Sequence, residues 1–249
     1  MKEFFVDKYH VRLMDHNDLE EVKRIQKLRY DHLLKEYNPS LVDGGIDDDN
    51  YDDVSDSIIV IDTTNNMICG TYRVATMKTI KDHKFLIEEQ YDITSLKESG
   101  YDFLELGRAV VHPEYRIGFV IQILFLAVYR YMVEHNCRYS IGLCSFHGHD
   151  PSVYSDGFSY LKDNYLFEDE RIKAISNPFP MGNKEYDINK AKDQLPGLLK
   201  MYLKFGNKVS SEGSIDLSFN SCDVLMIFDI EKANMRYINH FFKLGVKEI

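Results

Sequence analysis

The chain has 249 residues, of which 44% are hydrophobic and 28% are charged, and its formal net charge is -10 at pH 7. This composition is typical of a soluble globular protein that buries roughly 70–75% of its unfolded surface. The negative charge argues against a general nucleic-acid binder, which needs a basic face.

Cellular location follows from the cysteines and from the apolar segments. The four cysteines are scattered without a C-x-x-C pair, which indicates a reducing compartment. The N-terminus lacks the apolar core of a signal peptide, and the longest apolar run, 119–128, is too short to span a bilayer. We therefore expect a cytoplasmic protein, with peripheral contact at the inner face of the membrane as an open alternative.

The N-terminal part predicts a strand followed by a helix. The strand is expected at 9–14. Asn17 is the predicted N-cap, with Glu20 completing a capping box, and the helix is expected to end near Lys35. Its inward stripe consists of Leu19, Val22, Ile25 and Leu28. Arg29 lies close to this stripe, where the ordinary interpretation is a surface arginine whose stem covers apolar surface.

An acidic loop is predicted at 38–56, followed by two strands. Its run of Asp47 to Asp53 invites a calcium interpretation, but the EF-hand spacing and the closing glutamate are missing. A solvated loop is the ordinary outcome for such a run, and an acidic pocket for a substrate ammonium is the alternative. The strands are expected at 57–62 and 67–75, and Arg73 lies inside the second.

The centre of the chain predicts a strand–helix–strand unit with a right-handed crossover. Residues 103–111 read as a strand that His112-Pro113 ends. From Arg116 the apolar spacing becomes helical, with Ile117, Val120, Ile121, Leu124, Phe125, Val128 and Met132 on one face. A second strand is expected at 139–143. A carboxylate inside a buried strand, such as Glu105, must be paired or must take part in function.

The C-terminal part contains a short cluster of possible metal ligands, Cys144, His147, His149 and Asp150. A structural zinc site needs four ligands and no second ligand pair is nearby, so we expect no metal. Helices are expected at 152–165, 195–205 and 231–242, and a buried strand is expected at 223–230, with 78–100 partly helical and 171–193 irregular. Lacking a linker or a repeat, the chain predicts one domain, with an integrated C-terminal extension from about residue 146.

The order of elements and five short motifs resemble GNAT N-acyltransferases. Glu105 to Arg108 (Glu-Leu-Gly-Arg) and His112 to Arg116 resemble the branch with ornithine N-acyltransferases, which act in ornithine-lipid synthesis, and acyl-homoserine-lactone synthases. Leu28 to Tyr30, Asp49 to Asp52 and Gly70 to Arg73 agree with it. The tail, at 195–206 and 216–224, resembles the ornithine side. The resemblance implies an α/β fold of the α+β type, with a mixed, mostly antiparallel central sheet flanked by helices.

The family implies transfer of a fatty acyl group from acyl carrier protein to the amine of an amino acid such as ornithine. GNAT members that use CoA cradle its pyrophosphate with a [QR]-x-x-G-x-[GA] loop at a helix N-terminus. Here Arg116 to Ile121 contains one glycine, at the wrong spacing. We therefore expect the phosphopantetheine of a carrier as donor, with acyl-CoA as the alternative and no permanently bound cofactor.

The resemblance also assigns site residues. Glu105 is the expected general base. Arg108 falls on the opposite strand face unless a bulge intervenes, and GNAT folds do bulge here, exposing a backbone N–H to the thioester oxygen. Asp49 and Asp52 are expected to bind the substrate's ammonium or to hold the loop against Arg29 and Arg73. The expected donor-binding residues are Leu106, Gly107, Val110, Val111, Arg116, Gly118 and Ser145.

Several alternatives stay open. A buried Arg29–Asp52–Arg73–Glu105 network could merely fix the fold. The enzyme could instead be an acetyl-CoA-dependent N-acetyltransferase or resemble the lactone synthases. It could also be a non-catalytic GNAT domain that binds acyl carrier or lipid. If the partner is the acidic carrier, we expect docking through a basic patch drawn from Arg116, Arg130 and Arg138.

Overall fold

The protein is described by a computed structural model covering residues 1–42, 44–117, 119–182, 185–242 and 245–248. The chain forms two compact units, which are described in turn. Unit 1 comprises Met1–His83, Leu104–Cys137 and Arg236–Ile249, and unit 2 comprises Lys84–Phe103 and Arg138–Met235. The expectation that these belong to one domain, with an extension from about residue 146, stays a prediction.

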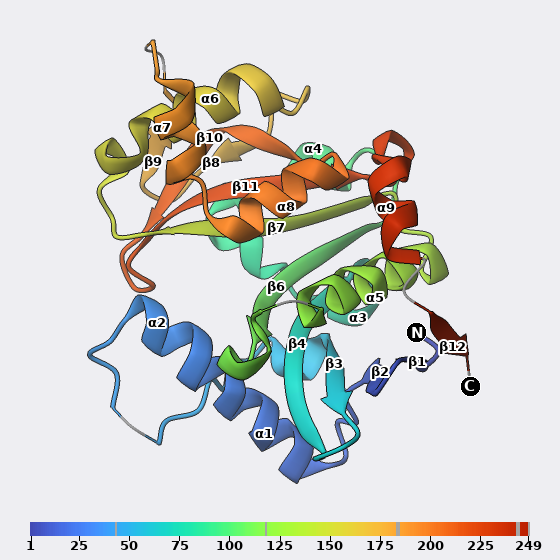
Figure 1. Ribbon diagram of the computed structural model, residues 1–249. Helices are drawn as coiled ribbons and strands as arrows, with labels where there is room; N and C mark the ends of the chain where they lie inside the picture. The colour runs from blue at the N-terminus through green and yellow to red at the C-terminus, as the bar shows by residue number, and fades with distance from the viewer. Residues whose placement is uncertain (43, 118, 183–184, 243–244, 249) are drawn as a thin grey trace. The chain divides into compact units, whose positions relative to one another are not determined.

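Unit 1 is built on an antiparallel sheet with the strand order β12-β1-β2-β3-β4-β6 (Figure 1). The strands are β1 (Phe4–Val6), β2 (Tyr9–Leu13), β3 (Asp56–Asp62), β4 (Met67–Thr76), β6 (Phe103–Val111) and β12 (Val246–Glu248). The predictions for β2, β3, β4 and β6 are confirmed to within one residue at each end. The edge strands β1 and β12 were not predicted, since three residues carry too little pattern.

The first helix is longer and less regular than a simple α-helix. It consists of α1 (Leu19–Arg29), the π-helical segment η1 (Tyr30–Leu34) and α2 (Lys35–Tyr37). The predicted cap is wrong by one residue, because the Asp18 side chain accepts the backbone N–H groups of Glu20 and Glu21. Leu19 is 67% exposed rather than inward-facing, since it lies at the start of the helix, before the part that packs on the sheet.

The long central helix α5 (Val120–Glu134) begins later than its apolar spacing predicts. The 3-10 turn η4 (Pro113–Tyr115) precedes it, so Ile117 lies outside the helix and is fully exposed instead of joining the apolar face. Two short helices complete unit 1, α3 (Met77–Ile80) and α9 (Met235–Phe242). The final helix therefore starts later than the predicted Glu231, because the 3-10 turn η6 (Ile230–Lys232) comes first.

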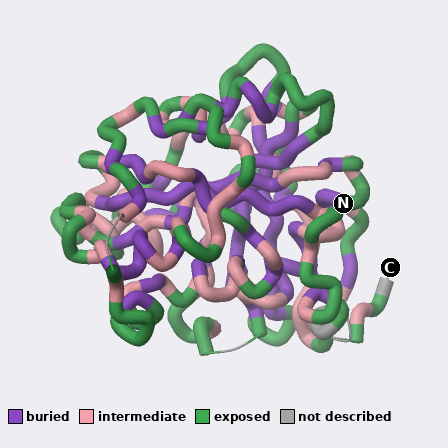
Figure 2. The backbone as a smooth tube through the Cα atoms, turned by 90° about the horizontal axis from the view of Figure 1, so that it is seen from above, coloured by how far each residue is buried: buried purple, intermediate pink, exposed green. Residues whose placement is uncertain are grey.

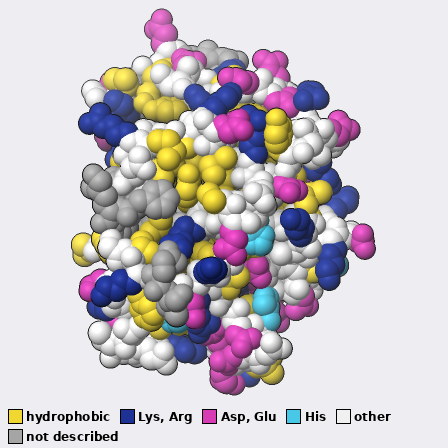
Figure 3. All heavy atoms as spheres, turned by 90° about the vertical axis from the view of Figure 1, so that its right-hand side faces the viewer, with side chains coloured by type: hydrophobic (Ala, Val, Ile, Leu, Met, Phe, Trp, Pro, Cys, Tyr) yellow, Lys and Arg dark blue, Asp and Glu magenta, His cyan; other side chains and the backbone are white. Residues whose placement is uncertain are grey.

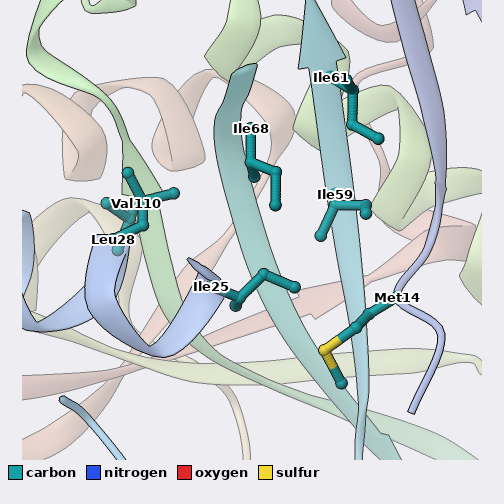
Figure 4. Packing of buried hydrophobic residues seen from close by; sticks show 7 residues of the cluster. All are labelled: Met14, Ile25, Leu28, Ile59, Ile61, Ile68 and Val110. Carbon is teal, nitrogen blue, oxygen red and sulfur yellow. The ribbon is translucent and has the colours of Figure 1, made fainter. Parts of the chain in front are cut away.

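Helices α1 and α5 cover opposite faces of the unit 1 sheet. Ile25 and Leu28 of α1 point toward the strands that carry Ile59, Ile68 and Val110 (Figure 4), and Met14 and Ile61 complete this buried cluster. On the other face Gly70 allows α5 to approach closely. A Cβ atom added at Gly70 would lie 2.7 Å from Val120 Cγ1, closer than packed carbon atoms approach one another.

Unit 2 has a four-stranded antiparallel sheet in the order β7-β11-β10-β9 and a separate pair, β5-β8. Its strands are β5 (Tyr91–Asp92), β7 (Tyr139–His147), β8 (Lys173–Ala174), β9 (Pro178–Pro180), β10 (Lys208–Asp216) and β11 (Ser221–Asp229). Strand β11 confirms the predicted buried strand. Strand β10 was not predicted, because it is rich in serine and its pairing shifts register between Val209 and Gly213.

The helices of unit 2 agree with the predicted helical segments and add one. They are α4 (Thr94–Lys97), α6 (Ser155–Tyr165), α7 (Ile188–Gln194) and α8 (Gly197–Phe205), with the 3-10 turns η3 (Leu86–Glu89) and η5 (Pro151–Tyr154). Helix α7 lies in the stretch predicted to be irregular. Gly206 ends α8 in the left-handed conformation at φ 106°, as its position predicts.

Strand β7 runs past its predicted end at Leu143 to His147, which separates the suggested metal ligands. Successive strand residues point to opposite faces, so Cys144 and His147 do not converge. Cys144 is 3% exposed, and burial raises the pKa of its thiol to about 12.

Figure 2 shows the buried stretches of the chain in purple and the exposed turns in green. Within the described residues, no helix combines the length and the apolar character needed to cross a membrane.

Candidate active site

A closed ring of alternating charges lies on the α1 face of the unit 1 sheet. Three elements of the fold supply its arginines, and the acidic loop supplies its aspartates: Arg29 from α1, Arg73 from β4 and Arg108 from β6, with Asp47, Asp49 and Asp52. Each aspartate bridges two arginines and each arginine contacts two aspartates. The ring therefore carries no net charge, although every member is itself charged.

Arg29 is the most deeply buried member, with 1% of its surface exposed, so the interpretation as a surface arginine is wrong. Its Nη1 and Nη2 atoms donate to the two carboxylate oxygens of Asp52 at 2.7 and 2.6 Å. Its Nε lies 2.9 Å from Asp47 Oδ2. Burial by itself lowers the pKa of Arg29, but the aspartates outweigh it and the pKa is raised.

Asp52 links Arg29 to Arg73. Arg73 Nη1 lies 3.3 Å from Asp52 Oδ1 and 2.6 Å from Asp49 Oδ1. Burial alone would raise the pKa of Asp52, but the hydrogen bonds and charges of the two arginines lower it below its ordinary value of 3.8. Asp52 is therefore ionised at neutral pH and paired with both arginines. The predicted contact of Asp49 and Asp52 with the two arginines is present.

Arg108 closes the ring from β6. Its Nε donates to Asp47 Oδ2 at 2.8 Å and its Nη2 donates to Asp49 Oδ2 at 3.1 Å. The side chains of Arg108 and Asp49 are each 22% exposed, whereas those of Arg29 and Asp47 are almost fully buried. The Asp49–Arg108 pair is therefore the solvent-accessible edge of the ring.

A bulge in β6 places Arg108 on the ring side, as the sequence predicted. Val110 pairs with Thr71 and Gly107 pairs with Arg73, so Arg108 and Ala109 together oppose Tyr72 alone. Arg108 has the positive φ of 54°, which is typical of one form of bulge. The bulge interrupts the regular pairing between β4 and β6 at Arg108 and Ala109.

Glu105 lies on the same face of the sheet as the ring. It opposes Ala75 on β4, two residues from the Gly107–Arg73 pair, and its residue is 9% exposed. Residues in this diagonal relation lie about 7–8 Å apart, within reach of long side chains. Glu105 is therefore a buried carboxylate close to the bulge, on the face of the sheet that carries the ring.

Asp47 was not among the predicted site residues. It bridges Arg29 and Arg108, and its backbone carbonyl also accepts from Arg29 Nη2. The sequence did contain a sign of this pairing, because its acidic run at 47–53 has no basic run to neutralise it. A loop with several aspartates can be neutralised by arginines inside strands and helices, and α1, β4 and β6 each contribute one arginine to the ring.

The expected donor-binding residues fall into two groups. Leu106, Gly107, Val110 and Val111 flank the bulge in β6, and the Val110 side chain is part of the buried cluster under α1. Arg116 lies beyond the end of β6 and pairs with Glu36 Oε2 at 2.7 Å. Ser145 lies on β7 of unit 2, and Gly118 lies outside the described residues. The donor-binding roles therefore stay predictions.

The docking patch expected from Arg116, Arg130 and Arg138 stays a prediction. Arg116 precedes α5 and Arg130 lies near its end in unit 1. Arg130 stacks over Phe4 at 4.3 Å, and Arg138 in unit 2 pairs with Asp229 at 3.2 Å. On the face shown in Figure 3, basic side chains are interspersed with acidic ones.

The chain is similar to proteins named L-ornithine N(alpha)-acyltransferase. The one from Brucella abortus is 32% identical over 210 residues, which cover 78% of this chain and 74% of the relative. The one from Rhodobacter capsulatus is 27% identical over 242 residues, which cover 92% of this chain and 93% of the relative. The acetyltransferase (GNAT) domain family matches residues 28–126.

Solved structures give the same fold. TofI in an apo form matches with a TM-score of 0.52 at 12% identity, covering 92% of this chain and 95% of that chain. BjaI, a CoA-dependent acyl-homoserine lactone synthase in a structure with MTA, matches with a TM-score of 0.50 at 11% identity, covering 95% and 90%. At these identities the likeness is one of fold, and it confirms the predicted GNAT architecture. With the relatives above, it follows that the chain belongs to the family of L-ornithine N(alpha)-acyltransferases, which are N-acyltransferases of the GNAT fold.

Proposed function

We propose that this enzyme transfers a fatty acyl group from acyl carrier protein to the α-amino group of ornithine. The observation that carries the proposal is the position of Glu105, buried beside the bulge of β6 on the face that holds the charge ring. A carboxylate there can take a proton from an ammonium, and the bulged backbone can face a thioester carbonyl.

The reaction needs a base, an oxyanion donor and a place for the acceptor. Glu105 takes one proton from the ammonium, and the lone pair of the neutral nitrogen attacks the thioester carbonyl carbon. The negative charge that develops on the carbonyl oxygen is stabilised by a backbone N–H near Gly107 and Arg108. The C–N bond forms, the C–S bond breaks, and the leaving thiolate takes the second proton that the nitrogen loses.

The accessible edge of the ring suits an amino acid acceptor. Asp49 and Arg108 present a carboxylate and a guanidinium 3.1 Å apart, and both are partly exposed. A zwitterionic amino acid carries the opposite pair, an α-ammonium and an α-carboxylate. We assign Asp49 to the α-ammonium and Arg108 to the α-carboxylate, while Arg29 and Asp52 hold the loop from behind.

The proposed donor is a carrier-bound thioester. The family loop for the CoA pyrophosphate is missing between Arg116 and Ile121, and Arg116 could meet the single phosphodiester of phosphopantetheine. We expect kcat/KM with acyl carrier protein to exceed that with acyl-CoA of the same chain by at least ~10-fold, roughly 1.4 kcal/mol. Equal kcat/KM values for the two donors would contradict the proposed preference for acyl carrier protein.

Intact-mass detection of acylated amines tests the function itself. The purified enzyme is incubated with each donor and with a panel of ornithine, lysine, glutamine and glycine. Acylated ornithine as the main product supports the proposal. A homoserine lactone from S-adenosylmethionine, or acetylated amines from acetyl-CoA alone, would replace it with one of the other GNAT activities. Absence of product from every donor and amine would instead favour a binding protein.

A further inference from the structure

A stripe of polar residues crosses the sheet of unit 2. It includes part of the segment 216–224, which the proposed reaction does not use. Asp223 on β11 pairs with Ser145 on β7 and with Ser214 on β10. Ser221, two residues earlier, pairs with His147 and with Asp216. Directly paired residues and alternate residues of a strand share one face of a sheet. Hydroxyls and carboxylates thus gather on a single face of this sheet.

The carboxylate of Asp223 is buried, and the described groups that act most on its pKa include no cation. The residue is 2% exposed, and burial raises its pKa to about 6. Its hydrogen-bonding neighbours are the side chains of Ser145, Ser221 and Gln90, which lower the pKa, and the charge that acts on it most is a second carboxylate, Asp216, which raises it. Such an arrangement is unfavourable for an ionised group unless something positive is added.

Three buried acceptor atoms in this group lack a well-formed hydrogen bond within the described chain, namely Asp223 Oδ1, Ser221 Oγ and Gln90 Oε1. The orientation of Gln90 follows from its neighbour, since its Nε2 donates to Asp216 Oδ2 at 3.3 Å and a carboxylate can only accept. Buried polar atoms in folded proteins almost always have partners, so three orphans in one place indicate a missing ligand or water.

The kind of ligand follows from this set of atoms. A primary ammonium carries three N–H donors and one positive charge. The group offers three acceptor atoms and one available negative charge, because Asp216 already accepts from Gln90, from Ser218 Oγ and from the backbone N–H of Phe219. Calcium needs six to eight oxygen ligands and zinc prefers nitrogen and sulfur, so neither metal suits the site. Water has two donors and no charge.

We propose that Asp223, Ser221 and Gln90 form a binding site for a primary ammonium group in unit 2. Gln90, Ser145 and Asp216, which surround the site, are each partly exposed. Two sources could supply this chemistry, a free ammonium ion or the amine of a small molecule such as the side chain of a diamino acid. The inference does not depend on the transfer reaction, because binding is measured without a donor.

The test measures ligand binding to the full chain at pH 7.5 by calorimetry and by the shift in melting temperature. The probes are ammonium chloride, propylammonium chloride and tetramethylammonium chloride, which has the same charge but no N–H, at matched ionic strength. Ornithine against norvaline, which lacks the side-chain amine, gives the arm for a diamino acid. The variants are Asp223→Asn and, as a matched control, Asp163→Asn on the exposed face of α6.

Binding of an N–H-bearing probe in preference to tetramethylammonium, weakened at least about 10-fold by Asp223→Asn and not by Asp163→Asn, supports the site. Binding of ammonium chloride but of no organic amine would identify the free ion as the ligand. Tighter binding of ornithine than of norvaline would identify a side-chain amine as the ligand. If Asp223→Asn does not fold, Ser221→Ala, which removes one acceptor and no charge, must weaken binding in its place. Equal binding of all cations, no binding of any, or no effect of either variant overturns the proposal, whatever the transferase assay gives.

Discussion

Substitution of Asp52 by asparagine tests whether the charge ring holds the acidic loop in the folded protein. Asp52 accepts both terminal nitrogens of Arg29 at 2.7 and 2.6 Å and lies 3.3 Å from Arg73. Asparagine keeps the shape but removes the charge, which leaves three buried or half-buried arginines facing two aspartates. Breaking a buried ion pair in this way typically destabilises a protein by ~3–5 kcal/mol.

The effect is measured as the free energy of unfolding in guanidinium chloride and as the melting temperature. At about 2–4 °C per kcal/mol for a chain of this size, the loss corresponds to roughly 6–20 °C. Because the folded pKa of Asp52 lies below 3.8, its contribution is present above that pH and is lost as the pH falls through the folded pKa. The difference between wild type and Asp52→Asn should therefore vanish in acid.

The matched control is Asp53→Asn, one residue along the same loop and exposed. It should change the free energy of unfolding by no more than ~0.5 kcal/mol. If Asp52→Asn unfolds at the same denaturant concentration as Asp53→Asn, the ring does not hold the loop, and the structural role assigned to Asp52 is wrong.

Three further substitutions test other parts of the fold and site. Glu105→Gln should lower turnover by about 10²–10⁴-fold with little change in melting temperature, and a stable variant with near-normal turnover would show that Glu105 is not the base. Gly70→Ala, with its added Cβ 2.7 Å from Val120, should lose ~1–3 kcal/mol in chemical denaturation, whereas Gly197→Ala, with open space around it, should not. For Asp223, whose folded pKa of about 6 exceeds the ordinary 3.8, stability should fall by up to about 3 kcal/mol as the pH rises from 4 to 6, with Asp216 as the neighbouring charge. Asp223→Asn should abolish that fall. A variant whose stability depends on pH as in the wild type would contradict this prediction.

The parts of the fold that could be predicted are those in which one segment carries its own pattern. Strand β6 (Phe103–Val111) has the predicted bounds because its alternation is interrupted only by charges and ended by proline. Strand β11 and helix α8 are similar cases. The sequence pattern fails to predict segments whose structure depends on contacts with other segments. Strand β10 is held by its neighbours in spite of its serines, and Ile117 is exposed in spite of its helical spacing.

The site could be predicted only through motifs, and its energetics could not be predicted at all. Glu105, Arg108, Arg73 and Asp52 were proposed because short stretches resemble a family. Asp47 was missed, and the burial of Arg29 was only one of two alternatives, since nothing local distinguishes a buried ion pair from a solvated one. Arg108 and Asp47 are 61 residues apart in the chain, and only the folded sheet brings them to 2.8 Å. Such pairs obey spatial rules that no periodicity expresses.

The ring also explains why the acidic loop can be ordered. Four carboxylates within the six residues from Asp47 to Asp52 repel one another, and the loop has little apolar surface to bury. Its structure must therefore come from the arginines, which reach it from α1, β4 and the bulge of β6. Conversely, each arginine would be a buried, unpaired charge if the loop were displaced. Loop and bulge are thus mutually dependent, so the accessible Asp49–Arg108 edge exists only when helix, sheet and loop have assembled together. A substitution anywhere in the ring should then disturb the acceptor edge as well as the contact that it removes.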